Sequence, residues 1–223
     1  MLTTLKYKVS PDAIQNALAH IPTDSLRVTI SQPTGNFFYD PWVVKEEFVG
    51  TVWEQLLSVL PAANVGEARV ITLAPGSCYQ IHADIDDRYH LNIAGDNGYL
   101  VDIEHNDLHQ TVQDGQWYLM DAGRLHSAAN FGRDFRLQLV VRKLLIRNVL
   151  SNSVPINLIS NNSMTDDHNR FLFDNTISPW LNKANKLGYI NDFSYSPVSV
   201  KFNIEHAKLD LLKDILPKEF EIV

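Results

Sequence analysis

The sequence predicts a mainly β protein whose core is an antiparallel sandwich or barrel. Residues 66–146 hold short runs rich in β-branched and aromatic residues, and no helical stretch separates them. Pro75-Gly76 is a turn signal, and Asp96-Asn97-Gly98 is a hairpin signal between two of the runs. The predicted strands cover residues 68–73, 79–84, 89–93, 99–104, 117–120 and 135–141.

The N-terminal residues 1–65 add helices to this core. Ser10 and Pro11 are typical of an N-cap followed by proline at the first helical position, and they predict a helix that runs to residue 20. Apolar residues at helical spacing predict a second helix over residues 45–60. Residues 26–30 alternate like a strand between the two.

The C-terminal residues 147–223 differ in composition from the rest. Residues 151–175 are rich in asparagine, serine and aspartate, which is typical of a loop or linker. Helices are predicted at 178–187 and 206–216, and a strand at 198–204.

These patterns predict two parts of unequal size. The first is a β domain over residues 1–146, in which N-terminal helices (1–65) flank the core (66–146). The second, residues 147–223, is expected to be a small extension formed by a loop and a mostly helical cap.

Composition and charge restrict the class of protein. Apolar residues make up 45% of the 223 residues and charged residues 20%, as in ordinary soluble domains. The net charge of −7 argues against nucleic acid as a partner. No apolar run could span a bilayer, and the first residues lack the apolar stretch of a signal peptide. A cytoplasmic protein without a membrane partner is expected, with its single cysteine, Cys78, buried as a small hydrophobe.

His82-Ala83-Asp84 and the later His126 are candidate metal ligands and catalytic residues. Two imidazoles and one carboxylate form the ligand set that holds non-haem Fe(II) and leaves coordination positions open. Residues two apart in a strand point to the same face, so His82 and Asp84 can both point inward, with His126 closing the site from another strand.

A short His-x-Asp motif also occurs by chance, and this chain contains a second copy. His105-Asn106-Asp107, with His109 nearby, lies in a polar stretch that resembles a turn. It is interpreted as a solvated loop, with an adventitious surface metal site as the alternative.

Residues in the following strands favour the first copy. Arg88, His90 and Asn92 share one face of a strand, which is either a solvent face or the interior wall of a barrel that binds an anion. Arg136 follows His126 by ten residues and lies opposite apolar neighbours in its strand. Such an arginine either extends to solvent or pairs with an anion, for example the carboxylate of a co-substrate.

The ordered series of motifs between residues 66 and 142 resembles the aspartyl/asparaginyl β-hydroxylase family, a branch of the Fe(II)/2-oxoglutarate-dependent dioxygenases. Bacterial proline hydroxylases of the cis-3 type belong to the same branch. The matching residues are Leu73-Ala74-Pro75-Gly76, His82-Ala83-Asp84, Arg88-Tyr89-His90, Asp114-Gly115-Gln116-Trp117, Asp121, His126, Asn130 and Arg136.

The resemblance implies a double-stranded β-helix, the jelly-roll or cupin-like fold. It implies Fe(II) held by His82, Asp84 and His126, and 2-oxoglutarate held by Arg136 through its distal carboxylate. Arg88 and His90 match residues that help to hold the co-substrate in family members. The implied reaction uses O2, decarboxylates 2-oxoglutarate to succinate and hydroxylates an amino acid, or an Asp, Asn or Pro residue of a peptide or protein.

Two other functions remain open from the sequence. A cupin-like metalloenzyme that does not use 2-oxoglutarate would keep the triad and would need no positioned arginine. A non-enzymatic β-sandwich binding module would keep the strands, but its two histidines and aspartate would not converge.

Overall fold

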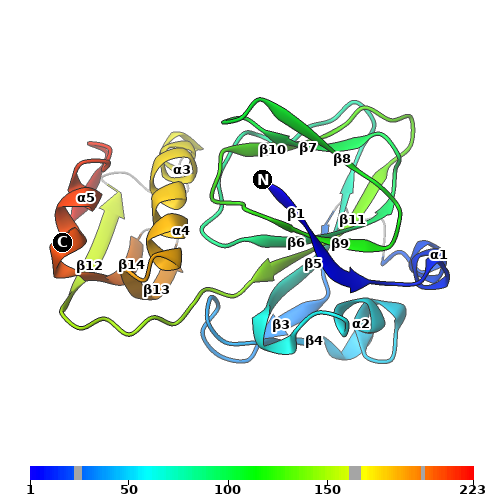
Figure 1. The fold of residues 1–223 in the computed structure, drawn as a ribbon, viewed down its shortest axis with the longest axis horizontal. Helices are drawn as coiled ribbons and strands as arrows, with labels where there is room; N and C mark the ends of the chain where they lie inside the picture. The colour runs from blue at the N-terminus through cyan, green and yellow to red at the C-terminus, as the bar shows by residue number, and fades with distance from the viewer. Residues whose placement is uncertain (23–26, 161–166, 197–198) are drawn as a thin grey trace.

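The computed structural model describes residues 1–22, 27–160, 167–196 and 199–223, and it is built mainly from antiparallel strands (Figure 1). A six-stranded sheet has the order β1-β9-β6-β11-β5-β2, and a three-stranded sheet has the order β10-β7-β8. The bounds are β1 Leu2–Lys8, β2 Arg27–Thr29, β5 Val65–Leu73, β6 Arg88–Ala94, β7 Gly98–Asp102, β8 Asp107–Thr111, β9 Gln116–Met120, β10 His126–Asn130 and β11 Arg136–Lys143. A short hairpin of β3 (Ser31–Pro33) and β4 (Trp42–Val44) lies beside β5.

The segment between β5 and β6 completes the smaller sheet, although it was predicted to be a regular strand. Isolated bridges join Cys78 to Ala129 and His82 to His126, so the segment follows β10 without forming a continuous ladder. When this segment is included, one sheet contains β5, β11, β6 and β9 in that order. The opposite sheet contains the segment, β10, β7 and β8 in that order. Eight consecutive segments divided in this way between two sheets form a jelly roll, which confirms the predicted fold class.

The two faces of the larger sheet have different roles. One face buries Leu91, Leu139 and Val70 against the N-terminal helices in the main apolar core. On the same strands, His90 and Gln138 alternate with these residues and face the three-stranded sheet. Arg88, His90 and Asn92 are all buried, so their polar face is an interior wall and not a solvent face.

The helices form where their caps allow. In α1 (Pro11–Ala19), Ser10 Oγ accepts from the Ala13 backbone N–H at 3.2 Å, as predicted. The second predicted helix is shorter than expected, because Gly50 has a φ of 76° and interrupts it after a 3₁₀ turn at Glu46–Phe48. α2 (Val52–Leu57) then starts afresh from Thr51, whose hydroxyl accepts from the Trp53 N–H.

The C-terminal residues form a sheet with helices and not the mostly helical cap that was predicted. The sheet has the order β13-β14-β12-β15, and β12 lies within the segment interpreted as a loop. The elements are β12 Ser153–Ser160, α3 Asp167–Leu172, a π-helix Phe173–Ile177, α4 Ser178–Lys186, β13 Ile190–Ser196, β14 Ser199–Glu205, α5 Leu209–Lys213 and β15 Phe220–Ile222. Ile156 and Leu158 of β12 point into a second apolar core, which outweighs the polar residues around them.

The second core joins the C-terminal residues to the jelly roll. Phe38, Tyr39 and Ile85 belong to the same buried cluster as Phe173 and Phe193. The Phe193 backbone N–H also donates to the Tyr39 hydroxyl at 2.9 Å. The two parts shown apart in Figure 1 are therefore packed against each other on the side where residues 83–85 lie. No helix among the described residues is long and apolar enough to cross a membrane.

Candidate metal centre

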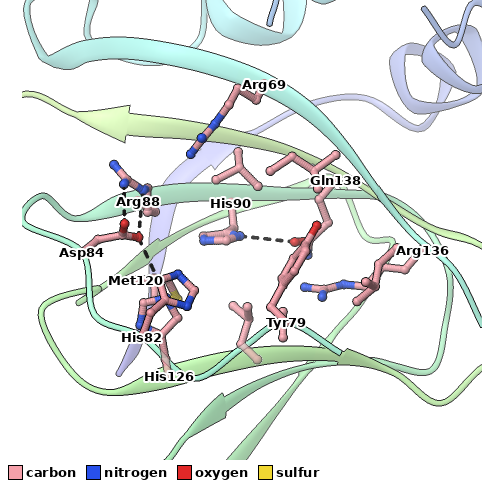
Figure 2. A pocket seen from close by; sticks show the side chains of 15 residues that line it. Arg69, Tyr79, His82, Asp84, Arg88, His90, Met120, His126, Arg136 and Gln138 are labelled. Carbon is pink, nitrogen blue, oxygen red and sulfur yellow. Dashed lines mark hydrogen bonds and ion pairs between the residues drawn. The ribbon is translucent and has the colours of Figure 1, made fainter. Parts of the chain in front are cut away.

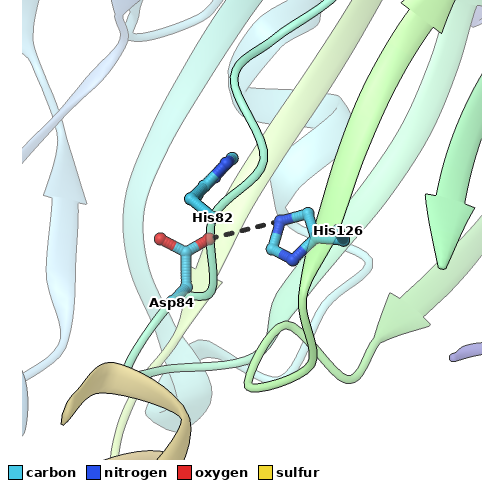
Figure 3. Close-up of side chains that lie close together, drawn as sticks. All are labelled: His82, Asp84 and His126. Atoms are coloured by element: carbon cyan, nitrogen blue, oxygen red, sulfur yellow. Dashed lines mark ion pairs between the residues drawn. The ribbon is translucent and has the colours of Figure 1, made fainter. Parts of the chain in front are cut away.

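The side chains of His82, Asp84 and His126 converge, with one potential ligand atom from each lying within 4.8 Å of the other two (Figure 3). His82 and Asp84 come from the irregular segment, and His126 is the first residue of β10. The backbones of the two histidines exchange hydrogen bonds of 3.0 and 2.9 Å, so the segment places both imidazoles on the same side. Asp84 is fixed by its backbone N–H, which donates to Ala122 O at 2.7 Å.

The two imidazoles are set in the same tautomer by the chain itself. His82 Nδ1 lies 2.8 Å from Gln80 O, and His126 Nδ1 lies 2.8 Å from Arg124 O. A carbonyl can only accept, so each Nδ1 carries the proton and each Nε2 keeps its lone pair. Burial further lowers the pKa of His126, which favours the neutral form that a metal requires. The donor set and its protonation therefore fit a divalent metal with nitrogen and oxygen ligands.

Asp84 is held as a carboxylate. Burial acts to raise its pKa, but positive charge, that of Arg88 first, outweighs burial and brings the pKa to about 2. Arg88 meets the carboxylate with two nitrogens, Nη2 at 2.7 Å and Nε at 3.1 Å, while its Nη1 donates to Asp86. Arg88 thus lies in the site as predicted, but in this structure its donors are directed at carboxylates of the chain.

The C-terminal residues contribute a backbone contact to the segment that carries His82 and Asp84. The Ala83 N–H, between these two residues, donates to the carbonyl of Asp174 at 2.9 Å. This carbonyl lies in the π-helix, where Ser178 N–H already bonds to Phe173 O. The next residue is Pro179, which has no N–H to offer, so the helix leaves the Asp174 carbonyl available for Ala83.

All six residues predicted for the site line one pocket of about 90 Å³ between the two sheets (Figure 2). They are His82, Asp84, Arg88, His90, His126 and Arg136. The triad lies at one side of this view, and Arg136 lies at the other beside Tyr79.

Arg136 is prepared for an anion. Its side chain is 2% exposed, and neither Nε nor Nη2 has a hydrogen-bond partner. Burial lowers its pKa to about 10, which leaves it charged at neutral pH. Gly98 makes room for it, because a Cβ there would lie 2.4 Å from Arg136 Cδ. A buried, charged and unsatisfied guanidinium is costly, and a carboxylate would satisfy it in a two-bond pair.

His90 lies between the triad and Arg136 (Figure 2). Burial first, and then the charge of Arg136, lower its pKa to about 3, so it is neutral at physiological pH. Its Nδ1 is 3.3 Å from Gln138 Oε1, and its Nε2 has no partner within the protein. His90 therefore offers a polar atom to the interior of the pocket without adding charge.

The second His-x-Asp motif does not form a comparable cluster among the described residues. His105 is 56% exposed and pairs with Asp102 at 3.2 Å, while His109 contacts Asp107 at 3.3 Å. Asp107 and His109 belong to β8, where a loop was predicted, because Asn106 adopts a φ of 51° and closes a tight turn before it. Cys78 is exposed, contrary to the expectation of burial.

The motifs in the sequence do not include two charged residues of the site, the buried Asp86 and the partly buried Arg69. Asp86 is 2% exposed and joins Arg88 to Arg142, whose Nε lies 2.5 Å from it. Arg69, in β5, lines the pocket above Arg88. The alternation of β5 places Arg69 on the inner face with Ile71 and Leu73, so the alternation of residues 68–73 is the signal that identifies it.

Comparison with known proteins confirms the resemblance for the middle of the chain. Residues 49–144 match the family model described as aspartyl/asparaginyl beta-hydroxylase, and this range contains all six predicted site residues. The match supports the predicted class of enzyme, an oxygenase-type hydroxylase. No curated protein matches the sequence.

Solved structures with similar folds include two prolyl hydroxylases and a cupin domain. A Pseudomonas putida prolyl-4-hydroxylase is 15% identical, with a TM-score of 0.41 over 64% of this chain and 91% of that chain. A viral collagen prolyl hydroxylase from Paramecium bursaria Chlorella virus-1 is 10% identical, with a TM-score of 0.42 over 65% and 96%. A cupin domain from Bordetella pertussis Tohama I is 15% identical, with a TM-score of 0.32 over 38% and 85%.

Proposed function

We propose that this chain, whose residues 49–144 match the aspartyl/asparaginyl β-hydroxylase model, is an Fe(II)- and 2-oxoglutarate-dependent dioxygenase. Its substrate is an amino acid, or an Asp, Asn or Pro residue of a peptide or protein. His82, Asp84 and His126 hold Fe(II), and Arg136 binds the distal carboxylate of 2-oxoglutarate. When bound, iron with 2-oxoglutarate and O2 supplies the oxidising power for hydroxylation of a C–H bond.

The observation that carries the proposal is Arg136. A metal triad alone fits many reactions, but the pocket beside this triad also contains a buried guanidinium with two unpartnered nitrogens. A small dicarboxylate has one end for a metal and one end for an arginine. The alternative of a cupin-like enzyme without 2-oxoglutarate gives no reason to bury an unpaired arginine there.

The other residues of the chain position and protect the reacting groups. The carbonyls of Gln80 and Arg124 keep each Nε2 free for the metal. Arg88 keeps Asp84 ionised and oriented, and neutral His90 adds a polar contact for the co-substrate in the middle of the pocket. The apolar lining, which includes Leu100 and Met120, excludes water around them.

The experiment is anaerobic titration of the protein with Fe(II) and 2-oxoglutarate, monitored by the visible charge-transfer band of the ternary complex. His126→Ala should abolish the band, because it removes a metal ligand, and should weaken metal binding by more than about 100-fold. Arg136→Gln should raise the 2-oxoglutarate concentration for half-saturation by about 100-fold or more, and should change metal affinity little.

His105→Ala is the control, since this histidine belongs to the second motif and lies outside the pocket. It should leave both affinities unchanged. A wild-type protein that binds Fe(II) but neither binds 2-oxoglutarate nor converts it to succinate would overturn the proposal, and would favour a metalloenzyme of another class. Equal loss of metal and 2-oxoglutarate binding in Arg136→Gln would instead assign Arg136 to folding.

A further inference from the structure

A second and larger cavity, of about 750 Å³, opens outside the triad. Its walls come from both parts of the chain: Ile71 and Tyr79 from the jelly roll, and Phe173, Ser178 and Tyr195 from the C-terminal residues. Binding sites of about 300–1,000 Å³ take ligands much larger than a free amino acid. The cavity therefore has room for a ligand body in addition to the group that reacts.

The two cavities share two members of the triad, His82 and Asp84, whereas His126 lines the inner pocket. The other residues that line both are Arg69, Ile71, Leu73, Tyr79 and Arg88. A ligand in the outer cavity thus reaches His82 and Asp84, as does a ligand in the inner pocket. Arg69 is the most notable shared residue, because it extends from β5 toward the junction (Figure 2).

Arg69 has an unmet requirement for an anion. Its side chain is 13% exposed, its Nε is buried without a partner, and its nearest carboxylate is Glu67, 3.6 Å from Nη1. Among the described residues lining the outer cavity, it is the one with an unpartnered buried side-chain nitrogen. A guanidinium in this state would gain a charge-assisted pair from a ligand carboxylate.

The neighbouring cations are already engaged. Arg88 is held by Asp84 and Asp86, and Arg142 is held by Asp86 and lies over the ring of Phe37 at 4.4 Å. Arg170, on the C-terminal wall, pairs with Asp174 at 3.5 Å and is 64% exposed. Arg27 also lines the cavity, but it is exposed, so the buried guanidinium nitrogen open to a ligand in the depth of the cavity is that of Arg69.

Aromatic rings form the outer part of the cavity. Phe37, Tyr79 and Tyr195 line it and keep 38–39% of their surface exposed. Large rings exposed in this way within a concave surface are typical of a ligand site, because they offer apolar contact without loss of much side-chain entropy. The stack of Arg142 on Phe37 fixes the position of one of these rings.

We propose that the outer cavity binds the substrate, and that this substrate is a carboxylate joined to an apolar body larger than a free amino acid. Arg69 pairs with the carboxylate and is a specificity-determining residue, while the rings of Phe37, Tyr79 and Tyr195 contact the body. This assignment rests on the proposed function for the identity of the site as a reaction centre. A blocked amino acid, a peptide carboxyl terminus and a longer acyl chain share this chemistry.

The test is calorimetric titration of the metal-free protein with three probes. N-acetyl-L-phenylalanine has the carboxylate and the body, its amide has the body alone, and L-proline has a carboxylate and a small body. The wild type should bind the first probe at least about tenfold more tightly than either of the others. The amide lacks the charge-assisted bond, and L-proline lacks an apolar body large enough to bury against the rings. A fourth probe, decanoate, carries the carboxylate on an acyl chain. Tighter binding of decanoate than of N-acetyl-L-phenylalanine would indicate a lipid-like ligand, and weaker binding a peptide-like one.

Arg69→Gln should abolish the preference for N-acetyl-L-phenylalanine over its amide, and Phe37→Ala should weaken both equally. Arg133→Gln is the matched control, because it removes an exposed charge outside both cavities and should keep the preference. Arg136→Gln should keep it as well, since that residue faces the inner pocket. Unfolding temperatures establish that each variant is folded.

Three results would overturn the assignment of Arg69: no preference for N-acetyl-L-phenylalanine over its amide in the wild type, a preference that survives in Arg69→Gln, or one that disappears in Arg136→Gln instead. Equal affinity for N-acetyl-L-phenylalanine and L-proline would overturn the other part of the inference, that the ligand has an apolar body larger than a free amino acid. None of these measurements uses iron or 2-oxoglutarate. The charge-transfer titration can therefore fail while this test succeeds, and the reverse also holds.

Discussion

At the scale of single residues, the site depends on which charges are neutralised and which are left open. Asp84 is paired with Arg88, whereas Arg136 and Arg69 have buried nitrogens without partners. The chain thus satisfies the groups that orient a metal and leaves unsatisfied those that would meet anions. The paired groups, such as Asp84 with Arg88, stabilise the fold. The unpartnered nitrogens of Arg136 and Arg69 lower its stability and favour the binding of an anion.

His90 provides a pH-dependent test of this arrangement. Its pKa in the folded protein is about 3, below the ordinary value of 6.5 that applies in the unfolded chain. As the pH falls from 6.5 toward 3, the unfolded chain takes up the proton first, so the unfolding free energy should decrease over this window. Urea unfolding of the ligand-free protein should show a decrease that His90→Gln reduces. Above pH 7 the unfolding free energies of the wild type and of His90→Gln should change with pH in parallel. If they stay parallel down to pH 4, His90 is not buried in its neutral form.

Most of the site could be predicted at this scale. His82, Asp84, Arg88, His90, His126 and Arg136 are recognisable by residue type and order, and the structure brings them into one pocket. The link from Arg88 through Asp86 to Arg142 could not be predicted, because Arg142 reaches Asp86 only when β6 and β11 pair. The unpartnered state of Arg69 is likewise a property of packing and not of sequence.

At the scale of elements, glycine positions decide whether Arg136 fits. β7 begins at Gly98, where a Cβ would lie 2.4 Å from Arg136 Cδ and 2.8 Å from Thr111 Oγ1. The first atom belongs to a side chain that can move only by leaving its buried position. The glycine of the hairpin signal that predicted this turn therefore also makes space for the arginine of the opposite sheet.

Gly98→Ala should displace Arg136 and raise the 2-oxoglutarate concentration for half-saturation by about tenfold or more, because a charge-assisted pair is lost or misplaced. Metal affinity should change less than threefold, on the order expected for a change outside the ligands. Gly50→Ala is the control: its added Cβ meets nothing within 4 Å, and it should lower the unfolding temperature through its φ of 76° alone. Unchanged 2-oxoglutarate binding in Gly98→Ala would show that Arg136 does not need its present position.

Helices and strands could be predicted where the apolar residues of the sequence pattern are also the buried ones. The core strands and α1 follow their patterns, whereas β12 and β8 were missed because their exposed faces are rich in Asn, Ser, Asp and His. The segment at 79–84 was predicted as a strand since it alternates, but it has a single neighbour, β10, and its Tyr79 and Ile81 are exposed. Pattern alone does not distinguish a strand with two neighbours from one with a free edge.

At the scale of the whole molecule, the C-terminal residues help to build the candidate site. They supply the carbonyl that holds Ala83, one wall of the outer cavity and most of the second core. Lys186 of α4 adds an ionic contact, at 2.7 Å to Asp87 and 2.8 Å to Asp121 of the jelly roll. The sequence did not reveal this dependence, because each contact joins residues more than 60 positions apart.

Lys186→Met should lower the unfolding free energy by about 1–2 kcal/mol, because Asp87 is largely buried and would lose its cationic partner. The estimate is reduced from that of a fully buried pair since the lysine is 40% exposed. Lys183→Met, on the same helix with an exposed lysine, should change stability by less than about 0.5 kcal/mol. Urea unfolding measures both, and equal effects would mean that the contact between the two parts does not depend on this ion pair.

The paired backbones of His82 and His126 have a consequence for how the protein acquires its metal. Each residue donates its N–H to the carbonyl of the other, and each ring is oriented by a carbonyl two residues earlier. The coordination geometry is thus encoded in main-chain hydrogen bonds, none of which requires an ion. Such a chain can complete its folding without a metal ion, and chelation of an ion bound by these side chains should leave it folded.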